Sequence, residues 1–473
     1  MKLSLSFPLF ICIVTFRAKT EARVAPPRSF SSLRSVVQEI PRGGGPFRKK
    51  QPSPPPAPPA PVTSTGGTAT IPNEVFNLVK NIVGAGVLSL PAGVAAFGNS
   101  PSALIPALSL ITIIGILSAF GFACIGKVCA YTGATSYREA WEQTVGRETS
   151  WIPAATSTFM TFSACLAYSM ILKDTFAALL RRPERTAILL VTTLFVLLPL
   201  CWMKELSSLA PFSLLGVLGM GYTTVAMGIR YADGSYSTFG SKLLESLAAD
   251  LRPEFGSDGW KSVFQPTSLI LVCMLSTAYM CHFNASKFYL ELKNNTLPRY
   301  YQVVGSSFAI AILLTCLVTA LGFLTFGSAS NGLVLNNYAA GDTLMSISRV
   351  AVAISLVFSY PLAFQGCRDG VLDLLKISPQ KRSNATLNVT TVGILALLTL
   401  LAATLTDVSF VLSFGGATLG NLLTYIYPAM MYYKVVSQKK LPNEGFGVFL
   451  GIVSAGLGVL MGAIGAKQAI DAL

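Results

Sequence analysis

The chain has 473 residues, of which 52% are hydrophobic and only 12% are charged. Soluble domains carry about 25% charged residues, so this composition excludes an ordinary soluble protein and predicts that most of the chain lies in lipid. The net charge of +14 comes from basic residues in the N-terminal region and in short loops between apolar runs, which excludes a nucleic-acid-binding face and is typical of a protein that crosses the membrane many times.

Residues 1–70 differ in composition from everything that follows. The apolar stretch 3–16 is too short to span a bilayer. It is followed by many Arg and Ser residues with few acidic ones, and then by a proline-rich run at 52–61. The apolar head resembles a secretory signal and the basic part resembles an organelle transit peptide, a combination similar to the two-part leader of algae with complex plastids. The alternative is a disordered cytosolic tail. Both interpretations stay open, and the transmembrane domain is expected at 71–473.

Eleven apolar stretches of roughly 20 residues follow, the length that a ~30 Å hydrocarbon core requires. Their approximate limits are 73–97, 102–126, 151–179, 186–203, 209–229, 266–288, 302–326, 344–365, 387–405, 408–433 and 446–468. The longest loop, 231–265, separates the first five from the next five. The sequence therefore predicts an all-α integral membrane protein with eleven transmembrane helices.

Basic residues in the loops indicate the orientation. If Asn73 starts in the cytosol, the inward-facing loops hold 14 Lys and Arg residues and the outward-facing loops hold 9. Because basic residues are enriched on the cytosolic side, a cytosolic N-terminus is favoured. The count does not distinguish the plastid envelope, a vacuolar or other internal membrane, and the plasma membrane.

The first expected span contains a break at its midpoint. Gly84, Ala85 and Gly86 lie where an unbroken helix would carry larger residues, and Pro91 follows. Glycine costs about 1 kcal/mol and proline about 3 kcal/mol in a helix interior. Within a membrane, irregular backbone is tolerated where it contacts protein or a watery cavity. The break therefore predicts either a binding site or a close helix–helix contact.

A second break is expected in the span 266–288, the first span after the long loop. Its centre, 276–284, is rich in small and polar residues and holds His282, the one histidine of the chain. Interrupted helices at corresponding positions of two halves indicate an inverted-repeat transporter with its site at the repeat interface. His282 itself is either a proton relay or a hydrogen-bonded residue between helices.

The two breaks offer complementary chemistry. Freed N–H groups at Gly84, Ala85 and Gly86 suit a carboxylate, and freed carbonyl groups near Tyr279 to His282 suit an ammonium group. Together they bracket an α-amino acid. The remaining candidate substrate-binding residues are Tyr168, Tyr279, Cys281 and His282.

Candidate ion ligands and unusual charges lie on other spans. Ser355 and Ser359 offer hydroxyl oxygens to a cation, or join helices. Arg349 on the same span needs a partner or a watery cavity. Asp174 is expected near the outer end of the third span, either paired or solvated.

Four motifs resemble the amino acid/auxin permease superfamily, which includes neutral, proton-coupled and vacuolar amino acid transporters. They are 76–78 with 82–91 (FNL and IVGAGVLSLP), 167–168 through 173–175 (AY and KDT), 206–209 with 213–216 (LSSL and SLLG), and Cys281-His282 with Tyr289, Glu291, Leu292, Asn294 and Arg299. The match runs from about 73 to 468. It implies the five-plus-five inverted repeat of the bacterial leucine transporter with one extra helix, and alternating-access transport.

Two positions depart from the family pattern. Sodium-coupled members carry an Asn one turn before the glycine pair, where it helps to bind sodium. That position here is Lys80, with Asn81 beside it, and proton-coupled members carry a Lys near this place. The candidate ion-coupling residues are therefore Lys80, Asn81, Ser355 and Ser359, with a proton favoured over sodium. The family's Pro after Cys-His is Phe283 here.

These features predict a secondary active transporter for small amino acids that works by proton symport or antiport. The lack of an obvious counter-charge in the candidate site favours neutral amino acids. The alternative is an amino-acid-sensing receptor on the same fold. An enzyme is not expected, because the chain has one histidine and neither a GxSxG nor an HExxH motif. Nine cysteines without CxxC spacing indicate neither a disulfide framework nor a zinc site, and no metal or cofactor is expected.

Overall fold

The computed structural model describes residues 66–203, 211–237, 241–257, 259–377, 382–405 and 407–471. The chain divides into two units, Met1–Pro59 and Ala60–Leu473. The first unit lies outside the described residues, and of the predicted leader or tail at 1–70 only residues 66–70 are described. The fold below is therefore that of the second unit.

The described part of the second unit is all-helical, with three isolated β-bridges. Nine of its helical segments are long and apolar enough to cross a membrane, and a bent helix pair raises this to ten. The nine are Pro101–Thr132, Trp151–Leu180, Arg185–Trp202, Leu269–Glu291, Leu297–Phe326, Thr343–Leu374, Asn384–Thr404, Phe410–Lys439 and Gly445–Gly465, and the bent pair is Ile71–Ile82 with Gly86–Phe97. Each agrees in position with an expected span. Helix α9 (Pro211–Ala232) lies where the remaining one, 209–229, was expected.

The first span is broken where the sequence predicts. Helix α2 (Ile71–Ile82) ends before Gly84, a short 3-10 helix η1 (Ala85–Ser89) follows, and α3 (Leu90–Phe97) completes the span. The two parts are bent by 40°. Gly84 has an extended backbone, with φ −114° and ψ −162°, so the helix is interrupted by one or two residues rather than by a loop. Pro91 lies in the first turn of α3, where its missing N–H costs little.

The second break lies in the span Leu269–Glu291. Helix α11 (Leu269–Ala278) ends at Tyr279, and a 3-10 turn η8 (His282–Asn284) leads into α12 (Ala285–Glu291). The two breaks pack against each other, because a Cβ built on Gly86 would lie 3.4 Å from Ala278 Cα. At that distance a Cβ at position 86 would make an ordinary van der Waals contact with Ala278.

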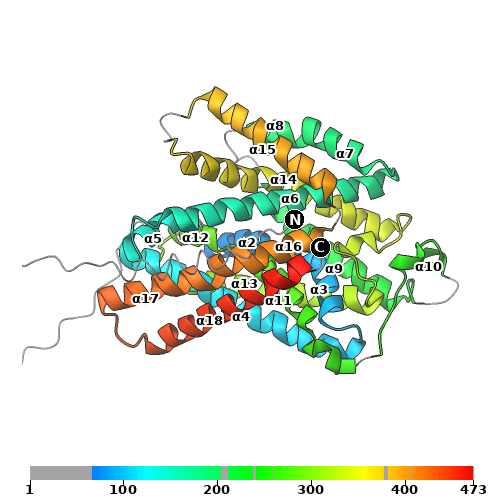
Figure 1. The fold of residues 1–473 in the computed structure, drawn as a ribbon, viewed down its shortest axis with the longest axis horizontal. Coiled ribbons are helices and arrows are strands. Elements are labelled where there is room, and N and C mark those ends of the chain that lie inside the picture. The colour runs from blue at the N-terminus through cyan, green and yellow to red at the C-terminus, as the bar shows by residue number, and fades with distance from the viewer. Residues whose placement is uncertain are drawn as a thin grey trace, which may run out of the picture. The chain divides into compact units, whose positions relative to one another are not determined.

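The long helices pack side by side in layers (Figure 1). α14 (Thr343–Leu374) contacts α6 (Trp151–Leu180) and α9, and α13 (Leu297–Phe326) contacts α2 and α4 (Leu104–Thr132). In the view of Figure 1, α15 (Asn384–Thr404), α7 (Arg185–Thr192) and α8 (Leu198–Trp202) lie above α6 and α14, while α17 (Tyr427–Lys439) and α18 (Gly445–Asp471) lie below. The broken helices α2 and α11 are thus enclosed by longer, unbroken ones.

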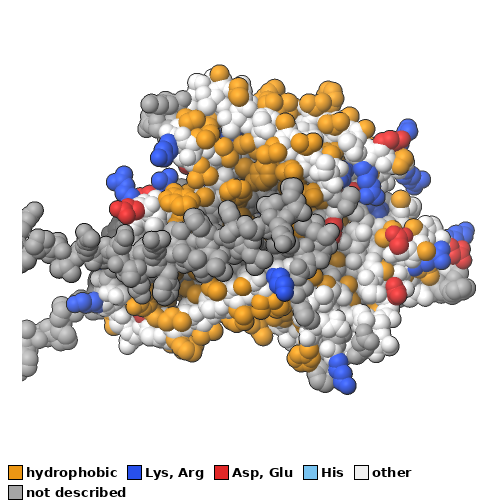
Figure 2. Space-filling model, viewed as in Figure 1, with side chains coloured by type: hydrophobic (Ala, Val, Ile, Leu, Met, Phe, Trp, Pro, Cys, Tyr) orange, Lys and Arg blue, Asp and Glu red, His pale blue; other side chains and the backbone are white. Residues whose placement is uncertain are grey.

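The surface chemistry fits a bilayer. Among the described residues on the face shown in Figure 2, hydrophobic side chains are spread along the length of the bundle, and most of the charged ones gather toward its two ends. Large apolar side chains such as Ile105, Phe195 and Val389 are at least 74% exposed, which water would not favour but lipid does. Helices α5 (Tyr137–Thr144) and α12 mark one end of the bundle in Figure 1, and the short α10 (Lys242–Glu245) marks the opposite end.

Candidate functional site

A cavity of about 990 Å³ lies between the broken helices and their neighbours α6, α14 and α16 (Val408–Gly415). Its inner part is lined by Gly84 and Gly86 of the first break. At the end marked by α5 and α12 it is lined by the exposed side chains of Arg138, Lys287 and Asp373. The cavity therefore connects the middle of the bundle to one surface, as a transport pathway requires.

Several of the residues singled out in the sequence meet at this cavity. Gly84, Gly86 and Tyr168 line it, and a Cβ built on Gly84 would lie 3.9 Å from Tyr168 Oη. Lys80 and Asn81 line it from the last turn of α2. The side chain of Ala85 is not described. The first break and the middle of α6 thus form one wall together.

Tyr279, Cys281 and His282 are not among the described residues that line the cavity. All three are fully buried. His282 Nε2 lies 2.9 Å from the backbone oxygen of Ser118, so this nitrogen carries the proton and donates, while Nδ1 has no hydrogen-bond partner among the described residues. From this break, the cavity is instead lined by neighbouring residues of the chain, Ala278, Met280 and Phe283.

A second, much smaller cavity of about 10 Å³ lies behind the first break, lined by Val83, Gly84, Gly216 and Ser355 among others. A Cβ built on Gly216 would lie 2.6 Å from Ser355 Oγ and 3.2 Å from Lys80 Cε. The side chains of Lys80 and Ser355 therefore meet over this glycine. The volume is close to the lower limit for one water molecule. Gly84 borders both cavities. Ser359 lines the large one and donates its hydroxyl proton to Ser355 O at 2.7 Å.

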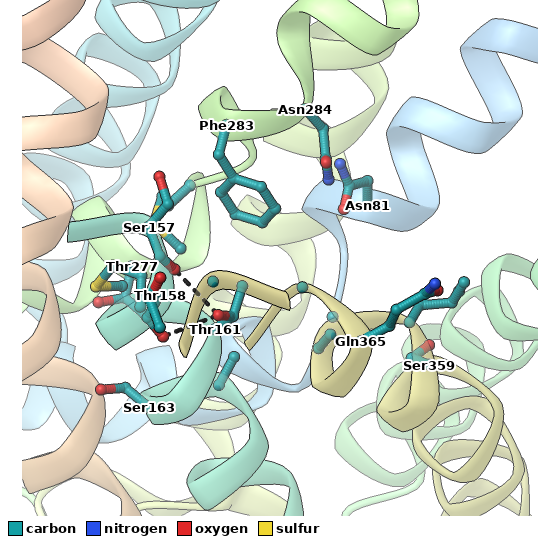
Figure 3. Close-up of a pocket in the computed structure, with 18 of the residues that line it drawn as sticks. Asn81, Ser157, Thr158, Thr161, Ser163, Thr277, Phe283, Asn284, Ser359 and Gln365 are labelled. Carbon is teal, nitrogen blue, oxygen red and sulfur yellow. Dashed lines mark hydrogen bonds between the residues drawn. The ribbon is translucent and has the colours of Figure 1, made fainter. Parts of the chain in front are cut away.

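The sequence interpretation missed the polar wall of the cavity. Figure 3 shows hydroxyl side chains of α6 beside Thr277, with the amides of Asn81 and Asn284 facing each other across the two breaks. The missed residues are Ser157, Thr158, Thr161, Ser163, Thr277, Asn284 and Gln365. One signal was present: Ser157, Thr161, Ala164 and Tyr168 recur at the spacing of a single helix face.

Two charged side chains that the sequence singled out, Asp174 and Arg349, make polar contacts away from the cavity. Asp174 at the end of α6 pairs with Arg185 at 3.4 Å and accepts a hydrogen bond from Asn336 Nδ2 at 3.3 Å. Of the two alternatives for Asp174, pairing is therefore correct and simple solvation is wrong. Arg349 finds its partners in backbone, since it donates to the carbonyl oxygens of Leu335, Tyr338 and Ala339 at 2.6–3.3 Å. These bonds hold the connection between α13 and α14 in place.

The open end of the cavity carries charges of both signs. Lys287 and Glu291 pair at 3.8 Å along α12. On the α14 side, Arg382 pairs with Asp369 at 3.5 Å and also with Asp373. The mouth is therefore electrostatically balanced, and it does not select strongly for the net charge of a solute.

Comparison with known proteins identifies the family. Residues 67–470 match the model of the transmembrane amino acid transporter protein family. The chain is 23% identical over 418 residues to a "Putative sodium-coupled neutral amino acid transporter 11" of Bos taurus, covering 86% of this chain and 84% of the relative. It is 22% identical over 397 residues to "Vacuolar amino acid transporter 2" of Saccharomyces cerevisiae, covering 80% and 79%.

Solved structures show the same fold at low identity. MhsT in complex with L-phenylalanine matches with a TM-score of 0.52 and 14% identity, covering 85% of this chain and 100% of MhsT. A manganese transporter of Eremococcus coleocola matches with a TM-score of 0.54 and 14% identity, covering 87% and 92%. These likenesses support the leucine-transporter-like arrangement around two broken helices. The chain belongs to the transmembrane amino acid transporter family, and it is a transporter rather than an enzyme.

Proposed function

We propose that the protein carries small neutral amino acids across its membrane by alternating access, with the substrate held between the two helix breaks. One observation carries this proposal: Gly86 and Ala278 bring the breaks into contact at the inner end of a 990 Å³ cavity that reaches one surface. A solute bound there is accessible from the surface at which the cavity opens, next to Arg138, Lys287 and Asp373.

The break in the first span supplies the carboxylate site. The N–H groups of Ala85 and Gly86 begin a new helical run and have no intrahelical acceptor, and the positive end of the helix dipole favours an anion. Tyr168 Oη adds a donor beside Gly84. Carbonyl groups at the end of α11 accept from the substrate ammonium. Tyr279, Cys281 and His282 act from behind this break by fixing its backbone.

Coupling is proposed to depend on Lys80, with Asn81, Ser355 and Ser359 around it. Lys80 places a protein cation over Gly216 next to Ser355, which disfavours a sodium ion at the same place by charge repulsion. A proton is then the simpler coupling ion. The name of one relative, "sodium-coupled", favours sodium instead. The argument for a proton therefore depends on the lysine at position 80.

The membrane arrangement is proposed to have eleven spans, with α9 as the fifth, and a cytosolic N-terminus. The open end of the cavity carries Arg138 and Lys287, which the count of basic loop residues assigns to the cytosolic side. In this arrangement the cavity faces the cytosol.

Flux in proteoliposomes containing the full chain tests the proposal. A panel of radiolabelled amino acids is offered with a pH gradient, with a sodium gradient, and with neither. We expect saturable uptake of neutral amino acids that a pH gradient increases and a sodium gradient does not. Uptake that follows sodium would reject the proton, and binding without uptake would favour the sensing receptor.

A further inference from the structure

On α6, the wall of the large cavity carries hydroxyl groups that already donate hydrogen bonds to backbone carbonyl oxygens (Figure 3). Thr158 Oγ1 donates to the carbonyl oxygen of Ala154 at 2.8 Å. Thr161 Oγ1 donates to the carbonyl oxygens of Ser157 and Thr158, at 3.0 and 2.9 Å. Both side chains line the cavity and are at most 6% exposed. Each therefore uses its single proton within its own helix.

The same pattern occurs on the side of the second break. Thr277 Oγ1 donates to Leu412 O on α16 at 2.6 Å, and Thr277 lines the cavity. A hydroxyl group has one proton and two lone pairs. Once the proton is bonded to a carbonyl oxygen, the group can only accept a further hydrogen bond. A threonine hydroxyl can in general both donate and accept a hydrogen bond. At these positions of the cavity wall it can only accept one from a solute.

One neighbour of Thr161 bears on this argument. The thiol of Cys367 interacts with the Thr161 side chain. A thiol is both a weak donor and a weak acceptor. Whether it donates to Thr161 Oγ1 or accepts from it, at least one lone pair of that oxygen remains to accept a hydrogen bond from a solute.

We propose that Thr161 and Thr277 select the substrate side chain as hydrogen-bond acceptors, so that a side chain that donates a hydrogen bond, a hydroxyl or a carboxamide, is preferred over an apolar one of the same shape. This inference rests on the proposed function, because it takes the large cavity as the substrate site. An apolar side chain would leave the remaining lone pairs of these two hydroxyl oxygens without a donor, and that loss discriminates more strongly than shape alone.

The positions of the two residues assign them to side chains of different length. Thr277 directly precedes Ala278, which contacts Gly86 at the breaks, so it suits a short hydroxyl side chain. Thr161 is two turns along α6 from Tyr168, about 10 Å. It therefore suits a longer carboxamide side chain whose α-carboxylate lies at Gly84.

Competition between matched solutes in proteoliposomes tests the proposal. Threonine is compared with valine, which has the same shape without the donor, and glutamine is compared with methionine, which has similar length. In the wild-type protein we expect the donor-bearing solute of each pair to be preferred about tenfold, the effect of one hydrogen bond. Thr277→Val should reduce the first preference to near unity and Thr161→Val the second.

Three controls separate the acceptor role from a structural one. Thr156→Val makes the same change on α6 at a residue that does not line the cavity and instead bonds Ile152 O at 2.9 Å and Tyr427 Oη at 3.0 Å. It should leave both preferences intact. Thr161→Ser and Thr277→Ser keep the hydroxyl and should retain the preference that the valine variants lose, even if overall uptake changes.

The outcomes distinguish this inference from the proposed function. The proposal is supported if Thr277→Val loses the preference for threonine over valine and Thr161→Val loses the preference for glutamine over methionine. It is also supported if each valine variant loses both preferences. Equal uptake within both pairs by the wild-type protein overturns it, as does full preference in both valine variants. No uptake of any amino acid would overturn the proposed function as well.

Discussion

Gly84 is the residue at which the two cavities meet, and its backbone does not itself require glycine. Its φ of −114° with an extended ψ is open to any residue, and a Cβ would find only Tyr168 Oη within 4 Å, at 3.9 Å. The absence of a side chain therefore serves the solute rather than the fold. A larger side chain would project toward Tyr168, where the substrate carboxylate is proposed to bind.

Replacing Gly84 should separate folding from transport. We expect Gly84→Ala to retain uptake, and Gly84→Val to lower it at least about tenfold by blocking a charge-assisted hydrogen bond. Both variants should unfold at a temperature close to that of the wild type. Uptake measured beside thermal unfolding in detergent checks this, and normal uptake by Gly84→Val would remove the first break from the binding site.

Lys80 decides the coupling ion in this account. Lys80→Asn removes the cation beside Ser355 and restores the residue that the sodium-coupled pattern carries. We expect uptake by this variant to lose its dependence on a pH gradient and to respond to sodium. Lys287→Asn, which removes the same charge at the cavity mouth, is the control and should keep the wild-type ion profile. Identical profiles for Lys80→Asn and the wild type would reject the coupling argument.

Residues that break a helix were predictable, and residues that line a cavity were only partly so. Gly84 and Pro91 stand out because their helix costs are large compared with those of their neighbours. Thr161 and Thr277 did not, since hydroxyl residues in membrane helices commonly join helices. Which face of a helix meets the cavity is set by packing. The recurrence of Ser157, Thr161 and Tyr168 on one face of α6 marks that face but does not say what it meets.

At the scale of elements, a short backbone pairing ties the start of α2 to the end of α12. In this N-terminal bridge, residues 66–69 pair with 291–293 through Gly67 N to Leu292 O at 3.2 Å, Ala69 N to Glu291 O at 3.0 Å and Lys293 N to Ala69 O at 2.9 Å. Gly66 has a φ of +64°, and a Cβ on Gly67 would overlap the backbone of Glu291. The bridge therefore needs glycine at both positions.

Gly67→Ala should destabilise the protein by disrupting the N-terminal bridge. Overlap with backbone cannot be relieved by a side-chain rotation, so we expect a loss of about 1–3 kcal/mol and a melting temperature lower by a few degrees. The matched control is Gly305→Ala in α13, where a Cβ meets nothing within 4 Å and helix propensity improves. A melting temperature of Gly67→Ala equal to that of the wild type would contradict the overlap.

A second tie joins the last helix to α4. Glu444, in the connection before α18, accepts hydrogen bonds from Lys127 and Tyr432. Burial raises the pKa of Glu444, but the hydrogen bonds from Lys127 and Tyr432 outweigh burial and hold the pKa below its usual value of 4.5. Because the folded pKa is the lower one, the stabilisation is complete above the unfolded value and is lost as the pH falls through the folded value.

The stability of Glu444→Gln should accordingly depend on pH in a specific way. We expect the wild type to melt at a higher temperature than the variant at pH 7, with the difference shrinking as the pH is lowered below about 4.5. Thermal unfolding in detergent across that range measures the difference. A difference that stays constant with pH would show that the ionised carboxylate does not hold α18.

The helix breaks were predictable as elements, whereas the ties between elements were not. Both breaks follow from residues inside one span. The N-terminal bridge consists of backbone bonds between segments more than 220 residues apart, and glycines leave no side-chain pattern that would name their partner. Lys127 and Glu444 lie 317 residues apart in the sequence, and charge alone does not select one partner among many.

For the whole molecule, the positions of the membrane-spanning helices could be predicted from the sequence. Each candidate span agrees with an expected one because the length and polarity of a spanning helix are fixed by the bilayer. The 990 Å³ cavity itself was beyond prediction, since its walls come from six separate segments whose relative rotation only the packed bundle defines.

The central claim is that this molecule moves amino acids and does not merely bind them. Uptake of labelled neutral amino acids into proteoliposomes that contain only this chain tests it most directly, with protein-free liposomes as the background. The account predicts saturable uptake that unlabelled substrate inhibits and that Gly84→Val abolishes. Uptake equal to the background across the whole panel, by protein that remains folded in the liposomes, would contradict it.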